Sequence, residues 1–167
     1  MNHLATSKED ILAASRDLIK ENGWAAVSIR AVASRCSVSA GTIYNYYESK
    51  ADLLSDTIES IWHEIFFHPE DEQVFHDVES CISWIYERLE YGNRQFPGFF
   101  SLHSFGFMRD EKTSGKKRMM KTWGHILNGL CEVLGNDPKV RADVFDQEFT
   151  EKKFADILFS LILVSMI

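Results

Sequence analysis

Residues 28–50, which read SIRAVASRCSVSAGTIYNYYESK, decide the fold. The pattern predicts a helix over Ile29–Arg35, capped by the hydroxyl of Ser28, and another short helix over about 39–47, opened by a second capping serine. A tight turn at residues 36–38 joins them. Two short helices joined by such a turn are typical of a helix-turn-helix. The predicted core of this module comprises Val32, Ala33, Val38, Ile43 and Tyr47.

The second of these helices has the composition that reading DNA requires. A recognition helix must lie close to base edges, and Ala40 and Gly41 at its start keep the backbone free of large side chains. Thr42 can donate to a phosphate or present its methyl group to thymine. Asn45, one turn later, can bind an adenine edge. We therefore expect this helix to enter the major groove of duplex DNA.

Polar and basic side chains around this helix suit the DNA backbone. The hydroxyls of Tyr44 and Tyr46 can donate to phosphates, and Lys50 supplies a cation. Ser28 opens a helix whose first amides offer a further phosphate site. The ordinary alternative is that the tyrosines pack against the core and the lysine is simply solvated. The residues predicted to contact DNA are Ser28, Arg30, Ser39, Ala40, Gly41, Thr42, Tyr44, Asn45, Tyr46 and Lys50.

The spacing of these residues resembles that of the TetR/AcrR family of transcriptional regulators over roughly residues 7–55. The resemblance rests on Gly23, Ser28-Ile29-Arg30, Val32-Ala33, Val38-Ser39, Gly41, Thr42, Tyr44, Tyr47, Lys50 and Leu53-Leu54. It implies an all-α fold, with a three-helix helix-turn-helix DNA-binding domain over residues 1–52. A larger helical ligand-sensing and dimerisation domain would follow over residues 53–167. A helix from about residue 49 would link the two domains.

The turn region departs from the family pattern in two ways. Ser37 stands where the family usually has glycine, so we expect either a left-handed conformation at a cost of about 1 kcal/mol or a slightly different turn. Tyr46 stands where the family often has histidine, and Tyr47 where phenylalanine is usual. Tyr46 can still donate to a phosphate, although its hydroxyl lies farther from the backbone.

The charge of the chain is distributed unevenly. The 167 residues carry a formal net charge of −7, which looks unfavourable for binding DNA. The first 50 residues, however, hold six Lys or Arg against five Asp or Glu, a local charge of +1, and the remainder carries −8. Because DNA affinity depends on cations placed at phosphates, the acidic remainder does not exclude a DNA-binding function.

The sequence shows no pattern for metal binding, cofactor binding or catalysis. The three cysteines are far apart and form no CxxC pair, so we expect reduced thiols in a cytoplasmic protein. His63 and His68 are five residues apart and on different helix faces, so we expect no metal site. No nucleophile elbow, phosphate loop or catalytic carboxylate pair occurs, so we expect no enzymatic activity and no cofactor. The most apolar stretch, Ile157–Ile167, is shorter than the roughly 20 residues of a membrane span.

Helical periodicity continues through the rest of the chain. The expected landmarks are helix starts at Ser7, Ser49 and Thr150, a helix end at Gly23, a helix over about 74–89 and a loop over Lys112–Lys117. The last helix is apolar on most faces after Asp156. We therefore expect it to be buried in a core or in a subunit interface.

Aromatic and methionine side chains in the second half of the chain are suited to line a pocket for an apolar or aromatic small molecule. A stripe of this kind is more often plain core, and both readings stay open. The candidate effector-binding residues are Trp84, Phe99, Phe100, Phe105, Phe107, Met119 and Trp123.

These expectations combine into a ligand-responsive regulator, most simply a repressor. It would bind a near-palindromic DNA operator as a homodimer and be released by a small-molecule effector. Two alternatives stay open: a helical small-molecule-binding protein with a vestigial N-terminal module, and an activator on the same fold. The chain stops at Ile167 inside an apolar helix, so we expect either a sequence truncated at its C-terminus or a family member without its last helix. No membrane partner is expected.

Overall fold

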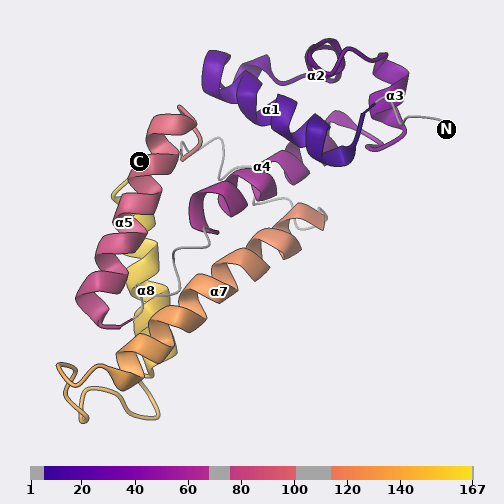
Figure 1. Ribbon diagram of the computed structural model, residues 1–167. Helices are drawn as coiled ribbons and strands as arrows, with labels where there is room; N and C mark the ends of the chain where they lie inside the picture. The colour runs from indigo at the N-terminus through magenta and orange to yellow at the C-terminus, as the bar shows by residue number, and fades with distance from the viewer. Residues whose placement is uncertain (1–5, 68–75, 101–113, 167) are drawn as a thin grey trace.

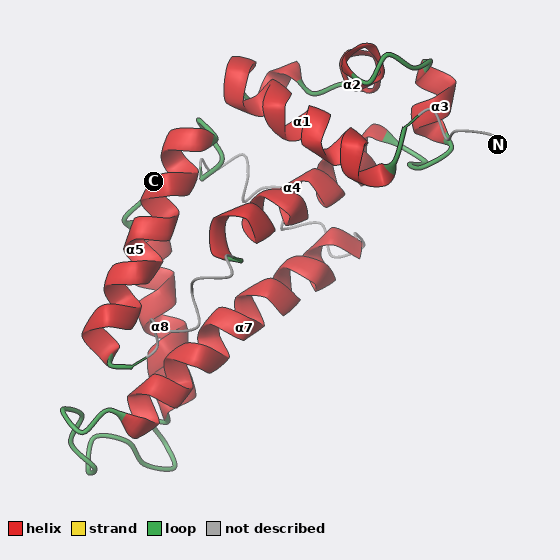
Figure 2. Cartoon of the chain, viewed as in Figure 1, coloured by secondary structure: helices red, strands yellow, loops and turns green. Residues whose placement is uncertain are grey.

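In the computed structural model, every regular element of the described residues is helical (Figure 2). The structure describes residues 6–67, 76–100 and 114–166, and for residues 114–122 it describes the backbone alone. The elements are α1 (Lys8–Asn22), the 3₁₀ turn η1 (Trp24–Ala26), α2 (Ile29–Arg35), α3 (Ala40–Tyr44), α4 (Lys50–Phe66), α5 (Val78–Gln95), α7 (Ser114–Asn136) and α8 (Glu151–Val164). The predicted all-α fold is confirmed.

Serine side chains fix where the first helices begin. Ser7, Ser28, Ser39 and Ser49 each precede a helix, and each serine oxygen accepts a hydrogen bond from the amide three residues later. At the first of these positions Asp10 completes a capping box, because its carboxylate accepts the serine amide at 2.8 Å. The predicted helix starts are therefore confirmed.

α3 is shorter than predicted and ends at Tyr44, not near residue 47. The amide of Asn45 donates to the carbonyls of both Gly41 and Thr42, at 3.2 Å each. Sharing one amide between the i−4 and i−3 carbonyls tightens the last turn toward 3₁₀ geometry. α3 therefore consists of little more than one turn.

The starts of α5 and α7 also differ from the prediction. α5 begins at Val78 and is capped by Asp77, whose carboxylate accepts the Ser80 amide at 2.8 Å. The expected start near residue 74 lies outside the described residues. The loop predicted over Lys112–Lys117 is wrong from Ser114 onward, because α7 begins there. Gly115 lowers helix stability by only about 1 kcal/mol, which the long helix-forming sequence after it outweighs.

α4 joins two groups of helices (Figure 1). The N-terminal helices, α1, α2 and α3, pack around Ile11, Ile19, Val32 and Ile43, all fully buried. α4 leaves this group beside α1 and packs against both α5 and α7, and α8 packs along α7. We call α5, α7 and α8 the C-terminal helices. Because α4 is one continuous helix, it transmits any change in its direction from one group to the other.

α4 and α5 approach each other closely where α4 ends. A Cβ atom placed on Gly92 of α5 would lie 2.5 Å from Cδ1 of Ile65, so a side chain here would require the Ile65 side chain or the helices to shift. In addition, the guanidinium of Arg88 donates to the carbonyls of Glu64 and Ile65. These carbonyls belong to the last turn of α4, which lacks partners within its own helix. α5 therefore fixes the end of α4.

α8 begins behind the cap of Thr150, as predicted, and buries only one of its faces. The buried face carries Ala155, Phe159, Ile162 and Leu163. On another face Ile157, Leu161 and Val164 are 50%, 63% and 66% exposed. Within this chain, the predicted burial of α8 therefore holds for one of its faces. None of the helices in the described part of the chain is long and apolar enough to cross a membrane.

Candidate nucleic-acid interface

Local hydrogen bonds and one buried side chain orient α3. The hydroxyl of Ser39 accepts the amide of Thr42 at 3.2 Å, and the two hydroxyl oxygens lie 3.0 Å apart. Ile43 is fully buried and anchors the inner side of the helix in the core of the N-terminal helices. The outer side of α3 therefore has a fixed direction before any partner binds.

The outer side of α3 is open to solvent. Gly41 and Asn45 are exposed, Tyr44 is 55% exposed, and Ala40 is half-buried against the core. A Cβ atom placed on Gly41 would lie 3.5 Å from the Ser39 hydroxyl oxygen, which is an ordinary van der Waals contact. Packing inside the chain thus does not require glycine at this position. Because Gly41 has no side chain, the outer surface of α3 is flat at this point, which suits the close approach of another molecule.

Three further predicted contacts lie on α2 and α4. Ser28 is half-buried, and its hydroxyl accepts the Ala31 amide at 3.1 Å. Arg30 and Lys50 are exposed, and neither forms an ion pair with another residue that the structure describes. Lys50 is the first residue of α4. Two cations with no competing carboxylate are therefore available to an anionic partner.

Ser37, in the turn between α2 and α3, and Tyr46, just after α3, have structural roles. The hydroxyl of Tyr46 donates to the carbonyl of Thr6 at 2.6 Å, which ties the segment before α1 to the end of α3. We therefore leave Tyr46 out of the interface proposed below. Ser37 has a φ of +57°, so the left-handed alternative for this turn is the one observed. The amide of Val38 donates to the Ala33 carbonyl at 2.9 Å and closes the turn.

Several acidic side chains of α1 are engaged by neighbouring groups. Arg35 of α2 donates to both carboxylate oxygens of Glu21, at 2.6 and 2.5 Å, and lies 3.6 Å from Asp17. This guanidinium holds the pKa of Glu21 below its ordinary value. Hydrogen bonds from Ser7 likewise lower the pKa of Asp10. Asp10 and Glu21 therefore stay ionised at neutral pH, and each carboxylate interacts with a neighbouring group of the chain.

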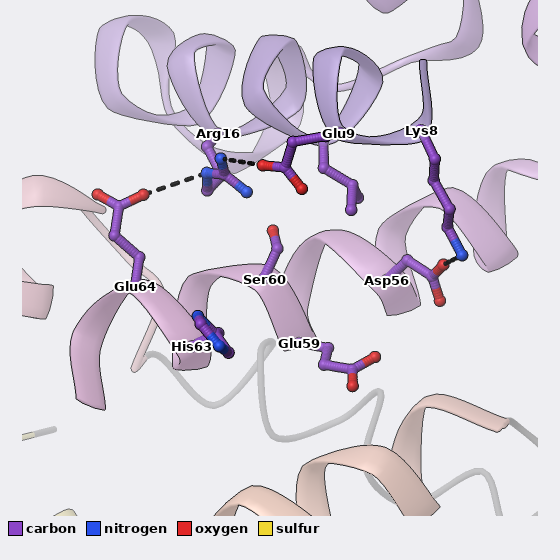
Figure 3. Close-up of a pocket in the computed structure, with 9 residues that line it drawn as sticks. Lys8, Glu9, Arg16, Asp56, Glu59, Ser60, His63 and Glu64 are labelled. Atoms are coloured by element: carbon purple, nitrogen blue, oxygen red, sulfur yellow. Dashed lines mark hydrogen bonds and ion pairs between the residues drawn. The ribbon is translucent and has the colours of Figure 1, made fainter. Parts of the chain in front are cut away.

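A groove of about 730 Å³ runs between α1 and α4 (Figure 3). Its walls carry opposite charges that pair across it. Nζ of Lys8 lies 2.6 Å from the carboxylate of Asp56, and Nε of Arg16 lies 3.1 Å from the carboxylate of Glu64. Arg16 also binds Glu9 at 3.0 Å. These pairs hold α1 on α4 and so contribute to fixing the N-terminal helices relative to the C-terminal ones.

Glu64 connects three helices. Its carboxylate accepts Nζ of Lys20 at 2.6 Å and the Arg16 guanidinium from α1, and the Tyr91 hydroxyl of α5 lies 3.4 Å away. Sequence reasoning missed this junction. The signal was present in the spacing of polar positions, four or eight residues apart, at 8, 16 and 20 on α1 and at 56, 60 and 64 on α4, which places each set on one helix face. The spacing does not tell which helix that face meets.

The described residues hold no group of three or more His, Cys, Asp or Glu side chains arranged to bind a metal ion. The three cysteines are free thiols. Burial raises the pKa of Cys81 to about 11, so this thiol stays protonated at neutral pH.

Three of the predicted effector-binding residues meet in one aromatic cluster, which we define as Trp62, Phe66, Phe99, Phe100 and Trp123. Trp62 of α4 is its centre, with ring centroids 5.3 Å from Phe99, 5.7 Å from Phe100 and 5.5 Å from Trp123. Sequence reasoning missed Trp62 because its spacing fits the ordinary apolar stripe of α4.

The remaining effector candidates have different positions. Trp84 of α5 is buried and packs against Phe66, at 5.6 Å between ring centroids, so it lies at the edge of the aromatic cluster. Phe105 and Phe107 lie outside the described residues, as does the side chain of Met119.

Comparison with known proteins identifies the N-terminal part. The profile of the family described as "Bacterial regulatory proteins, tetR family" matches residues 11–57, a segment that contains α2, α3 and the start of α4. Residues 11–57 are therefore similar to the DNA-binding segment of the tetR family. The flat outer side of α3 and the exposed cation at the start of α4 both lie inside the segment that defines the tetR family.

Two named transcriptional regulators match a segment of similar length. The HTH-type transcriptional regulator UidR of Escherichia coli (strain K12) is 38% identical over 48 residues, which is 29% of this chain and 24% of UidR. The HTH-type transcriptional repressor KstR of Rhodococcus jostii (strain RHA1) is 45% identical over 47 residues, or 28% of this chain and 22% of KstR. The similar segment thus spans about a quarter of each relative.

Solved tetR-family structures share the fold over nearly the whole chain. A TetR transcription regulator from Haloarcula marismortui matches 99% of this chain and 85% of its own, with a TM-score of 0.70 and 19% identity. The regulator SCO7222 from Streptomyces coelicolor matches 96% of this chain and 69% of its own, with a TM-score of 0.67 and 17% identity. The C-terminal helices therefore share the fold of these two structures.

Proposed function

We propose that this protein regulates transcription by inserting α3 into the major groove of duplex DNA. The observation that carries the proposal is the orientation of α3: Ile43 is fully buried, whereas Gly41, Tyr44 and Asn45 face solvent. Gly41 lets the helix backbone approach base edges, and Asn45 binds an adenine edge. Tyr44 donates to a phosphate. The remaining proposed contacts are Ser28, Arg30, Ser39, Ala40, Thr42 and Lys50.

We further propose that two copies act together on a near-palindromic operator. The exposed apolar side chains Ile157, Leu161 and Val164 form one face of α8, where a shallow groove of about 340 Å³ also includes Ser160. Because an apolar face of this kind favours association, we assign it to a second copy of the chain. A symmetric dimer then reads half-sites about 34–36 Å apart, or a multiple of that distance.

The aromatic cluster is the proposed effector site. An apolar or aromatic small molecule that binds among the C-terminal helices changes the direction of α4, and with it the spacing of the two α3 helices. Effector and operator then weaken each other's binding by the same factor, as linkage requires. Release of DNA by the effector makes repression the simplest mode of action. We place the boundary between the DNA-binding and effector-binding domains near residue 52.

Binding to the DNA upstream of the protein's own coding region tests the proposal. Arg30 and Lys50 of two subunits neutralise four phosphates, so the logarithm of affinity should fall with the logarithm of salt concentration with a slope of about −3.6. Lys50→Ala should weaken binding to all sequences equally and flatten this slope, whereas Asn45→Ala should relax preference at one base pair, at a cost of about 1–3 kcal/mol. A small-molecule carrier with a vestigial module would show no such binding. Transcription from the bound promoter in vitro then separates repression from activation.

A further inference from the structure

The aromatic cluster contains buried hydrogen-bond donors as well as apolar rings. Trp62 is only 1% exposed, and among the described residues no acceptor lies within hydrogen-bonding distance of its indole Nε1. The indole Nε1 of Trp123, which is equally shielded from solvent, also has no such acceptor. Buried tryptophans usually place their N–H against an acceptor. Two unmatched donors side by side therefore need an explanation.

Two other buried hydroxyls of the core find acceptors within the chain. The Ser15 hydroxyl donates to the Ile11 carbonyl at 2.9 Å, and the Thr57 hydroxyl donates to the Leu53 carbonyl at 2.7 Å. The second of these residues lies on α4, little more than one turn before Trp62. A polar group buried in this helix can thus find a partner, and the tryptophan N–H groups stand out by comparison.

Neighbouring rings are weak substitutes for a hydrogen-bond acceptor, although Trp62 also lies edge-to-face with Phe100 and Trp123 with Phe159. The rings of Trp62 and Trp123 are nearly perpendicular, with an interplanar angle of 81° and 5.5 Å between centroids. In a perpendicular pair one ring presents its edge and the other its face, so only one of the two N–H groups can point at its partner's ring. An N–H contact to a ring is also weaker than one to a carbonyl oxygen.

We propose that Trp62 and Trp123 donate hydrogen bonds to a carbonyl oxygen of the effector, which is an electrically neutral, largely apolar molecule. This inference rests on the effector site assigned under the proposed function. Indole N–H groups can only donate, so the ligand must supply an acceptor. A carboxylate would need a cation, and two described basic groups beside the end of α4 are engaged: Arg88 binds the carbonyls of its last turn, and Lys20 binds Glu64. Burying an unpaired carboxylate among the rings would be costly.

Three naphthalene probes test this chemistry. 2-Acetylnaphthalene, 2-ethylnaphthalene and 2-naphthoate share one ring system and differ in whether they carry a neutral acceptor, no acceptor or an anion. Each is titrated into the full chain labelled with ¹⁵N-indole tryptophan, and the indole signals are assigned by single Trp→Phe variants. We expect the acetyl probe to bind about three- to tenfold more tightly than the ethyl probe, as one neutral hydrogen bond supplies. The indole proton of Trp62 or Trp123 should move downfield with the acetyl probe only.

Two variants separate the donor role from packing. Trp62→Phe, which leaves Trp123 as the single donor, should reduce the preference for the acetyl probe over the ethyl probe, while Trp24→Phe, which alters a tryptophan packed against Phe99 from η1, should keep the preference unchanged. Equal affinities for the wild-type chain would overturn the proposal. So would tightest binding of 2-naphthoate, or unchanged indole signals up to the solubility limit of the probes.

Failure of this inference is distinguishable from failure of the proposed function. Operator binding is measured in parallel, with and without 2-acetylnaphthalene. Wild-type DNA binding together with an absent acetyl preference would overturn the donor role and leave the DNA-binding proposal intact. A clear acetyl preference in a chain that binds no DNA would support the donor role and contradict the regulatory function.

Discussion

The substitution Gly41→Ala separates the requirements of DNA binding from those of folding. The added Cβ would lie 3.5 Å from the Ser39 hydroxyl oxygen, a distance at which nothing has to move. Alanine also favours a helix over glycine by roughly 0.5–1 kcal/mol. The variant should therefore be as stable as the wild type or slightly more so. On the outer side, however, the new methyl group occupies the surface that we propose faces the base edges.

The expected loss of DNA affinity follows from what the methyl group displaces. If it holds the backbone of α3 away from the groove, Asn45 can no longer bind its base at full strength. A good bidentate contact contributes about 1–3 kcal/mol of discrimination, so specific binding should weaken by about that amount for each half-site. Fluorescence anisotropy with operator DNA at fixed salt measures this loss, and thermal unfolding measures the stability of the same sample.

Gly124→Ala is a matched control for this substitution. Gly124 lies within α7, and a Cβ atom placed there has no neighbour within 4 Å. The control should gain the same helix propensity and bind DNA as the wild type does. Wild-type operator affinity for Gly41→Ala would refute the close approach of α3 to the bases. A large loss of stability would instead show that the fold itself needs glycine at this position.

Three further substitutions probe two contacts between helices and the N-terminal cap of α1. Gly92→Ala should destabilise the chain by about 1–3 kcal/mol in chemical denaturation, because its Cβ would lie 2.5 Å from Cδ1 of the fully buried Ile65 and the core must shift to make room; an unchanged midpoint would contradict this. Glu64→Gln should loosen α1 from α4 and make the thermal unfolding transition less cooperative at low salt, an effect that should fade as salt rises; a loss independent of salt would point to packing instead. Ser7→Ala should lower the melting temperature at neutral pH, and the difference from wild type should shrink as the pH falls below about 4, because the folded-state pKa of Asp10 is lowered and its stabilising effect disappears when it is protonated; a difference that grows in acid would refute the assignment.

Local signals in the sequence were sufficient for the helix starts of the N-terminal part. A capping serine acts on the amide three residues later, so Ser28, Ser39 and Ser49 identify helix starts without any knowledge of the rest of the chain. The end of α3 was predicted less well, because it depends on how one amide is shared between two carbonyls. The start of α7 was predicted wrongly because Gly115, although typical of loops, is tolerated at the beginning of a long helical sequence.

Contacts between helices could not be predicted in the same way. The charged positions of α1 and α4 can be recognised as faces from their spacing, but only the packing of the two helices brings Arg16 to Glu64. Trp62 illustrates the same limit. Its place in the apolar stripe of α4 was visible in the sequence, whereas the lack of an acceptor for its N–H depends on every side chain that surrounds it.

The negative charge of the chain is compatible with DNA binding because of where the acidic groups lie. Arg16 and Arg35 bind acids of α1, so part of the negative charge of the first helix is directed toward cations within the chain. Exposed ion pairs of this kind add only about 0–1 kcal/mol of stability, and their larger effect is on the local electric field. Arg30 and Lys50, without ion-pair partners in the part of the chain that the structure describes, keep their charge available to a phosphate. The net charge of −7 averages over the C-terminal helices, which a duplex held at α3 need not touch. Charge near the reading helix therefore decides whether DNA can bind, and the sum over the whole chain does not.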